Sequence, residues 1–216
     1  VLIAVLLLIH AIRLKKLQMF LRDPILWAVA AYGLVNLIMA LCSSTGLSAI
    51  YAGLAINLRY VLFFGLVYVF ITLHPRYRPM FWRVGLIGAG IVIGFAVLQL
   101  VLPHDILKYL GYSKSTIAPY LTVDENPAYI RENSTLRGPN PLGAYAGSVA
   151  ILTVAYATAR WRQLRANSRH MLLVVGVFIA SLIALWVSYS RSALLAAIVG
   201  ITLIMIVKVA SRITRQ

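Results

Sequence analysis

"HMLLVVGVFIASLIALWVSYSRSALLAAIVGITLIMIVK" occupies residues 170–208, and its length decides the fold. Arg191 is the only charged residue between Arg169 and Lys208. A helix needs about 20 mostly apolar residues to cross the hydrocarbon core of a bilayer. The stretch is too long for one crossing and suits two, so it predicts a tight helical hairpin with Arg191 at its turn. Neither glycine nor proline marks that turn.

The rest of the chain has the same character. It is 62% hydrophobic and only 12% charged over 216 residues, whereas about a quarter of the residues of a soluble domain are charged. We therefore predict an all-α fold, a polytopic transmembrane bundle of about seven spans that forms one membrane domain. The first span is read as truncated, the tail of a helix that begins before this sequence. The expected spans cover residues 1–12, 25–42, 49–72, 84–102, 141–159, 171–188 and 193–208.

The basic residues indicate an orientation. The net charge is +15, but the cations form short clusters between the apolar runs, which is typical of orientation signals and not of a nucleic-acid surface. If every expected span is real, 14 of the 20 lysines and arginines fall on one side. That side is the cytoplasm by the positive-inside rule. The 14 cations lie in residues 13–23, 74–83, 160–170 and 208–216.

Residues 103–140 then form one sizeable extracytoplasmic loop. This loop carries four of the five acidic residues, and it is the only connection long enough to build a surface of its own. The outer face is therefore where we look for function. The single cysteine, Cys42, excludes a disulfide within the chain.

The end of this loop reads "RENSTLRGPNPLGAY", residues 131–145. Asn140 followed by Pro141 predicts an N-cap and a first helical position, which would leave N–H groups facing the loop. Arg137 lies three residues before that cap, and an arginine beside a helix N-terminus suits phosphate oxygens. Arg137 and Arg191 could equally be interfacial anchors that reach headgroup phosphates.

Other polar or small residues lie inside the spans. Arg59 is mid-span, where a charge is costly, so it predicts a possible intramembrane polar site that Asn36 and Asn57 would line. The pairs Gly143/Gly147 and Gly90/Gly94 have the spacing that allows close helix packing.

No cofactor or metal is expected from this sequence. The histidines His10, His74, His104 and His170 do not have metal-ligand spacing, and nucleotide-binding and serine-nucleophile motifs are absent. His104 could act as a base, although a lone loop histidine more often has no specific role. Asp124 and Glu125 could form a catalytic pair only with a geometry that the sequence does not give.

Two motifs resemble those of a known family. "STLRGPNPLGAY", then a helix, a basic loop and "SYSRSALLAA", is similar in order and spacing to the O-antigen ligase and polymerase superfamily of the bacterial inner membrane. The motifs cover about 65 residues, and residues 137–216 would be the start of the ligase or polymerase core region, truncated at the C-terminus.

The resemblance implies transfer of a glycan from an undecaprenyl-diphosphate-linked donor to a lipid, glycan or protein acceptor. It implies that Arg137 and Arg191, with Asn140, hold the donor diphosphate at the outer leaflet, where guanidinium groups stabilise the leaving group. The family's general base is usually a histidine in a later outer loop, which would lie beyond Gln216. The expected partners are membrane lipids, the lipid-linked glycan and its acceptor, but no nucleic acid. A secondary transporter or a non-catalytic membrane protein remains an alternative.

Overall fold

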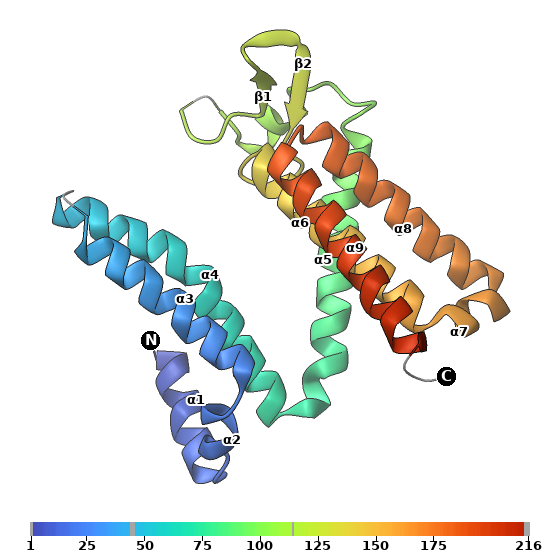
Figure 1. The fold of residues 1–216 in the computed structure, drawn as a ribbon. Coiled ribbons are helices and arrows are strands. Elements are labelled where there is room, and N and C mark those ends of the chain that lie inside the picture. The colour runs from blue at the N-terminus through green and yellow to red at the C-terminus, as the bar shows by residue number, and fades with distance from the viewer. Residues whose placement is uncertain (1, 44–45, 114, 214–216) are drawn as a thin grey trace. The chain divides into compact units, whose positions relative to one another are not determined.

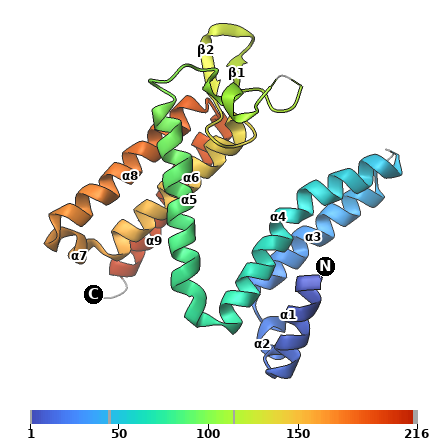
Figure 2. The same ribbon diagram turned by 180° about the vertical axis from the view of Figure 1, so that it is seen from behind.

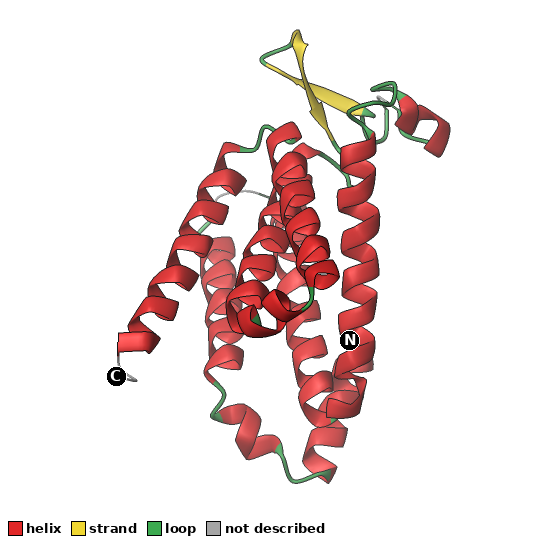
Figure 3. Cartoon of the chain, turned by 90° about the vertical axis from the view of Figure 1, so that its right-hand side faces the viewer, coloured by secondary structure: helices red, strands yellow, loops and turns green. Residues whose placement is uncertain are grey.

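The computed structural model describes residues 2–43, 46–113 and 115–213, which are mostly helical (Figure 3). The chain divides into two compact units, residues 1–83 and 84–216. The helices, two short 3-10 turns and two strands are α1 (Leu2–Arg13), α2 (Leu17–Leu21), α3 (Pro24–Leu41), α4 (Leu47–Leu73), η1 (Pro75–Tyr77), α5 (Arg78–Leu98), η2 (Ile106–Leu110), β1 (Tyr120–Val123), β2 (Asn126–Glu132), α6 (Pro139–Ala159), α7 (Trp161–Ala166), α8 (Ser168–Val187) and α9 (Arg191–Ile213).

Among the described residues, six helices are long and apolar enough to cross a membrane, namely α3, α4, α5, α6, α8 and α9. Their large apolar side chains are widely exposed; Leu172 and Trp186 of α8, for example, are each 74% exposed. A soluble protein rarely exposes contiguous apolar surface on this scale, so the chain is a multi-pass membrane protein. The sequence prediction of these six spans is confirmed. The remaining expected span, the truncated first one at residues 1–12, corresponds to α1, which has 12 residues.

In the first unit, α3 and α4 lie side by side (Figure 1). Asp23 caps α3: its Oδ1 accepts a hydrogen bond of 2.9 Å from the Ile25 N–H, and Pro24 occupies the first helical position. Between the two helices, the Asn57 amide donates to Asn36 Oδ1 over 3.2 Å. The two asparagines that the sequence suggested as polar partners are therefore in contact.

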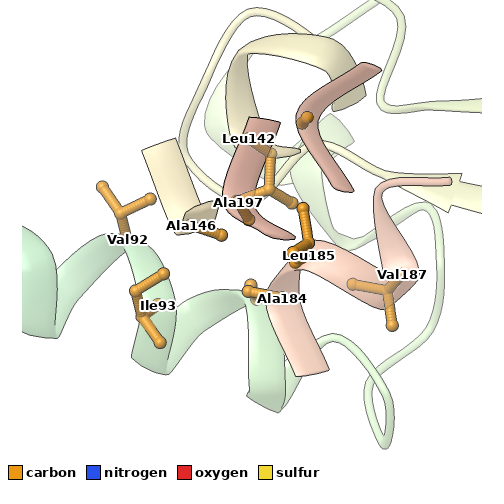
Figure 4. Packing of buried hydrophobic residues seen from close by; sticks show 10 residues of the cluster. Val92, Ile93, Leu142, Ala146, Ala184, Leu185, Val187 and Ala197 are labelled. Carbon is orange, nitrogen blue, oxygen red and sulfur yellow. The ribbon is translucent and has the colours of Figure 1, made fainter. Parts of the chain in front are cut away.

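The second unit is built around α6, which contacts both α8 and α9. Its core is made of small and branched apolar residues from α5, α6, α8 and α9, including Val92, Leu142, Ala146, Leu185 and Ala197 (Figure 4). Without bulky side chains in these positions, the helix backbones approach closely.

Gly143 is a point of close approach in this core. A Cβ placed there would lie 2.6 Å from the Cβ of Ser190 and 3.1 Å from the Cβ of Ala193. At Gly147 the nearest atoms would be 3.4 and 3.5 Å away. The predicted packing role of this pair is confirmed. At Gly90 and Gly94 a Cβ would meet no atom of the described chain within 4 Å, so the packing role of that pair stays a prediction.

The loop between α5 and α6 contains an antiparallel hairpin that the all-α prediction did not include (Figure 2). Asp124 and Glu125 form its two-residue turn with φ of 49° and 60°, as the type I′ geometry requires. The pairing passes from Thr122–Ile130 directly to Val123–Asn126, so residues 127–129 form a bulge in β2. Pro127 is accommodated there because a bulge needs no ladder hydrogen bond from it.

A buried polar layer attaches this loop to the bundle. The Ser134 N–H donates to Gln99 Oε1 over 2.8 Å, and the Ser134 hydroxyl donates to the Val92 carbonyl over 2.6 Å. The Asn133 amide donates to the Ala118 carbonyl over 2.6 Å. Gln99, Asn133 and Ser134 are all at most 1% exposed. The loop is therefore fixed on the end of α5 and is part of the fold.

Candidate anion pocket at the loop end of the second unit

Helix α6 begins two residues earlier than the sequence suggested. The N-cap is Gly138, Pro139 is the first helical residue, and the Leu142 N–H donates to the Gly138 carbonyl over 3.2 Å. The prediction of Asn140 as N-cap is wrong, because both prolines fit the first turn, where an N–H has no helical acceptor. The prolines also remove two donors, so Asn140 has the only N–H among the first three helical residues.

Freed from capping, the Asn140 side chain binds an arginine of β2. Arg131 donates from Nη2 to Asn140 Oδ1 over 2.6 Å and from Nε to the Ser188 carbonyl over 3.0 Å. One guanidinium group therefore joins the hairpin, the start of α6 and the turn between α8 and α9. The planar guanidinium group can donate to two acceptors in different directions at once. The compact ammonium group of a lysine lacks this fixed geometry.

Arg191 was predicted at the turn between two spans; it is the first residue of α9, directly after that turn. Tyr189 makes the reversal with φ of 49°, and the Ser190 N–H donates to the Ser188 hydroxyl over 3.2 Å. The first backbone bond of the new helix runs from the Leu194 N–H to the Ser190 carbonyl over 3.0 Å. The N–H groups of the first turn of α9 therefore have no acceptor within the helix.

These elements border an open polar pocket of about 500 Å³, within the size range of small-molecule sites. Two arginines, one aspartate, one asparagine and three hydroxyl-bearing residues line it, beside the N-terminal ends of α6 and α9. Helix N-termini and arginines both favour anions. The lining residues are Val123, Asp124, Arg131, Asn140, Tyr189, Ser190, Arg191 and Ser192.

A second cavity of about 470 Å³ adjoins this polar pocket, sharing Asn140, Ser190 and Ser192 with it. It continues between α6 and α9 along small and apolar residues. The other lining residues are Ala144, Gly147, Ser148, Ile151, Ala193, Ala196 and Ala197. Polar and apolar surface thus meet at these three shared residues.

Only some of the site residues that were predicted from the sequence line the polar pocket. Arg191 and Asn140 lie on the wall of the polar pocket. Arg137 is exposed and is not among the residues that line either cavity. Arg59 is an exposed residue of α4 in the first unit.

Sequence reasoning missed Arg131 and Tyr189. Side chains alternate between the two faces of a strand, so a predicted strand would have placed Arg131 and Glu132 on opposite faces. The strand was not predicted because a proline and an acidic turn are not typical of a hairpin. Tyr189 gave no signal, because a bulky residue is unusual at positive φ.

The strand also carries a histidine–carboxylate pair on its other face. His104 Nδ1 lies 2.6 Å from Glu132 Oε1, and Glu132 is 3% exposed. Burial raises the pKa of the Glu132 carboxyl above its usual value of 4.5, and the hydrogen bond from His104 partly opposes that rise. This pair fixes the start of the loop to β2.

No family model, curated protein or solved structure matches the chain in comparisons with known proteins. The site is therefore interpreted from its own residues.

Proposed function

We propose that this protein transfers a glycan from an undecaprenyl-diphosphate-linked donor to an acceptor at the outer face of a bacterial inner membrane. The observation that carries the proposal is the polar pocket, where Arg131 and Arg191 lie beside the N-terminus of α9. A diphosphate offers several anionic oxygens, and each guanidinium can bind two of them in its plane.

The adjoining cavity supports a lipid-linked ligand. Its apolar walls between α6 and α9 start at the same Asn140, Ser190 and Ser192 that border the polar pocket. An amphiphile would fit here, with its anionic head in the polar pocket and its apolar chain in the adjoining cavity. The basic clusters on the other side of the expected topology support an extracytoplasmic position.

The chemistry needed from the pocket is stabilisation of a leaving group. Breaking the bond between the sugar and the diphosphate leaves additional negative charge on the terminal phosphate. Fixed guanidinium groups and helix N–H groups stabilise that charge without reorganising. Arg131 is already fixed by its bonds to Asn140 and Ser188.

The test is binding and transfer by the full chain in lipid nanodiscs. We expect Arg131→Lys and Arg191→Lys each to weaken binding of undecaprenyl diphosphate about 10-fold or more, since charge-assisted hydrogen bonds contribute about 1.5–3 kcal/mol. Arg137→Lys tests the remaining arginine of the sequence prediction in the same way. Arg162→Lys in α7 is the matched control, because α8 separates α7 from the pocket by its 20 residues, about 30 Å.

Glycan transfer should fall with binding in the pocket variants, while membrane insertion stays normal. Unchanged binding and transfer in both Arg131→Lys and Arg191→Lys would reject the diphosphate site and favour an anchoring role for these arginines. Solute uptake that is lost in Arg59 variants, with no lipid diphosphate bound, would favour the transporter.

A further inference from the structure

We propose that Tyr129 and Tyr189 form the binding surface for the sugar ring that is attached to the diphosphate, an inference that rests on the proposed function. The two rings lie with centroids 6.4 Å apart and planes at 74°, so the edge of one faces the other and they make a corner. Tyr129 is 51% exposed and Tyr189 is 41% exposed. Tyr189 also lines the polar pocket next to Arg191.

The backbone at both positions departs from regular structure. Tyr129 belongs to the bulge of residues 127–129, which lies outside the regular pairing of β2. Tyr189 has φ of 49°, a conformation that glycine adopts without strain and a bulky residue rarely takes. Such departures persist where the surroundings enforce them and are concentrated at functional sites.

The aromatic corner is not required to attach the hairpin to the helical turn. Arg131 already makes that connection through its 3.0 Å bond to the Ser188 carbonyl. The rings therefore add exposed aromatic surface at a junction that is held by other bonds. Exposed ring faces carry partial negative charge, and the C–H groups on the less polar face of a pyranose carry partial positive charge.

Asp124 provides an independent indication. A carboxylate in the same pocket repels a diphosphate, so its presence is not explained by the anion alone. Sugar hydroxyls donate strong hydrogen bonds to a carboxylate. The pocket thus has arginines for the diphosphate, a carboxylate for hydroxyl groups and an aromatic corner for the ring.

The experiment compares two probes in nanodiscs, undecaprenyl diphosphate and the same lipid carrying one N-acetylhexosamine. We expect Tyr129→Leu and Tyr189→Gly to weaken binding of the sugar-bearing lipid by about 2- to 10-fold, the range of an aromatic contact. Binding of the bare lipid should change less than about 2-fold. Tyr189→Gly keeps the turn, since glycine tolerates its positive φ.

Matched controls separate the ring from the position. Tyr129→Phe and Tyr189→Phe keep the aromatic faces and should bind both lipids like the wild type. Tyr109→Ala removes a ring of the same loop that is 86% exposed and does not line the pocket; it should change neither affinity.

Equal loss of affinity for both lipids, or no loss for either, would overturn the sugar surface while leaving the diphosphate pocket intact. If the wild type binds neither lipid, the proposed function fails first and the sugar surface with it.

Discussion

Replacement of Gly143 by alanine probes the packing that holds the pocket together. The added Cβ would lie 2.6 Å from Ser190 Cβ and 2.7 Å from Ser188 Oγ, whereas carbon atoms in contact prefer about 3.5–4.0 Å. Ser190 Cβ is bonded directly to the backbone, so no rotamer change moves it away. The turn between α8 and α9 must shift by about 1 Å, and overpacking of this kind costs about 1–3 kcal/mol.

Alanine also favours a helix over glycine by about 1 kcal/mol, and a control variant removes this contribution. Gly90→Ala gains the same preference in α5 but meets no atom of the described chain within 4 Å. The difference in unfolding free energy between the two variants is therefore the steric cost alone, about 1–3 kcal/mol. Gly147→Ala, with its nearest contacts at 3.4 and 3.5 Å, should lie close to Gly90→Ala.

The measurement is unfolding of the detergent-solubilised protein by added SDS, followed by circular dichroism and tryptophan fluorescence. Gly143→Ala should unfold at the lowest SDS fraction of the three variants. Equal stability of Gly143→Ala and Gly90→Ala would show that α6 does not approach the α8–α9 turn as closely as described, and the geometry of the pocket would then have to be revised.

Three further outcomes are expected. Arg131→Ala should destabilise the second unit by about 1–3 kcal/mol, because it leaves two acceptors without their donor; SDS unfolding that matches the wild type would contradict this. Folding raises the pKa of the Glu132 carboxyl. Its contribution to the stability of the folded protein is therefore fully present below the unfolded-state pKa of 4.5, and it is lost as the pH rises through the folded-state pKa. Glu132→Gln should therefore flatten the fall in stability above pH 4.5 in thermal melts, and an unchanged slope would exclude Glu132 as its cause. Asn57→Leu should cost about 0.6 kcal/mol by removing the bond to Asn36, and a more stable variant on SDS titration would show that this contact is not stabilising.

The helices were predictable because each depends on a local property of the sequence. The bilayer requires about 20 apolar residues for each crossing, and only charged or turn-forming residues interrupt such runs. Arg191 therefore marked a helix start, although Tyr189 and not glycine makes the turn before it.

The pocket could be predicted only in part, since it depends on which long-range partners meet. The sequence indicated Arg191 and Asn140, but the assignment of Asn140 as a cap was wrong because its amide oxygen binds Arg131 instead. The hairpin that positions Arg131 relies on a type I′ turn without glycine and on a bulge at Pro127. Both depart from the usual turn signals.

The buried polar layer beneath the loop determines where foreign sequence can be inserted. Because the Ser134 N–H donates to the Gln99 side chain and its hydroxyl donates to the Val92 carbonyl of α5, an epitope tag placed between residues 132 and 135 would displace the start of α6. A tag next to Thr116, an exposed residue bonded only to Ser113 among its described contacts, would leave these bonds in place. Antibody labelling of the tag in spheroplasts would then report directly which side of the membrane the loop occupies.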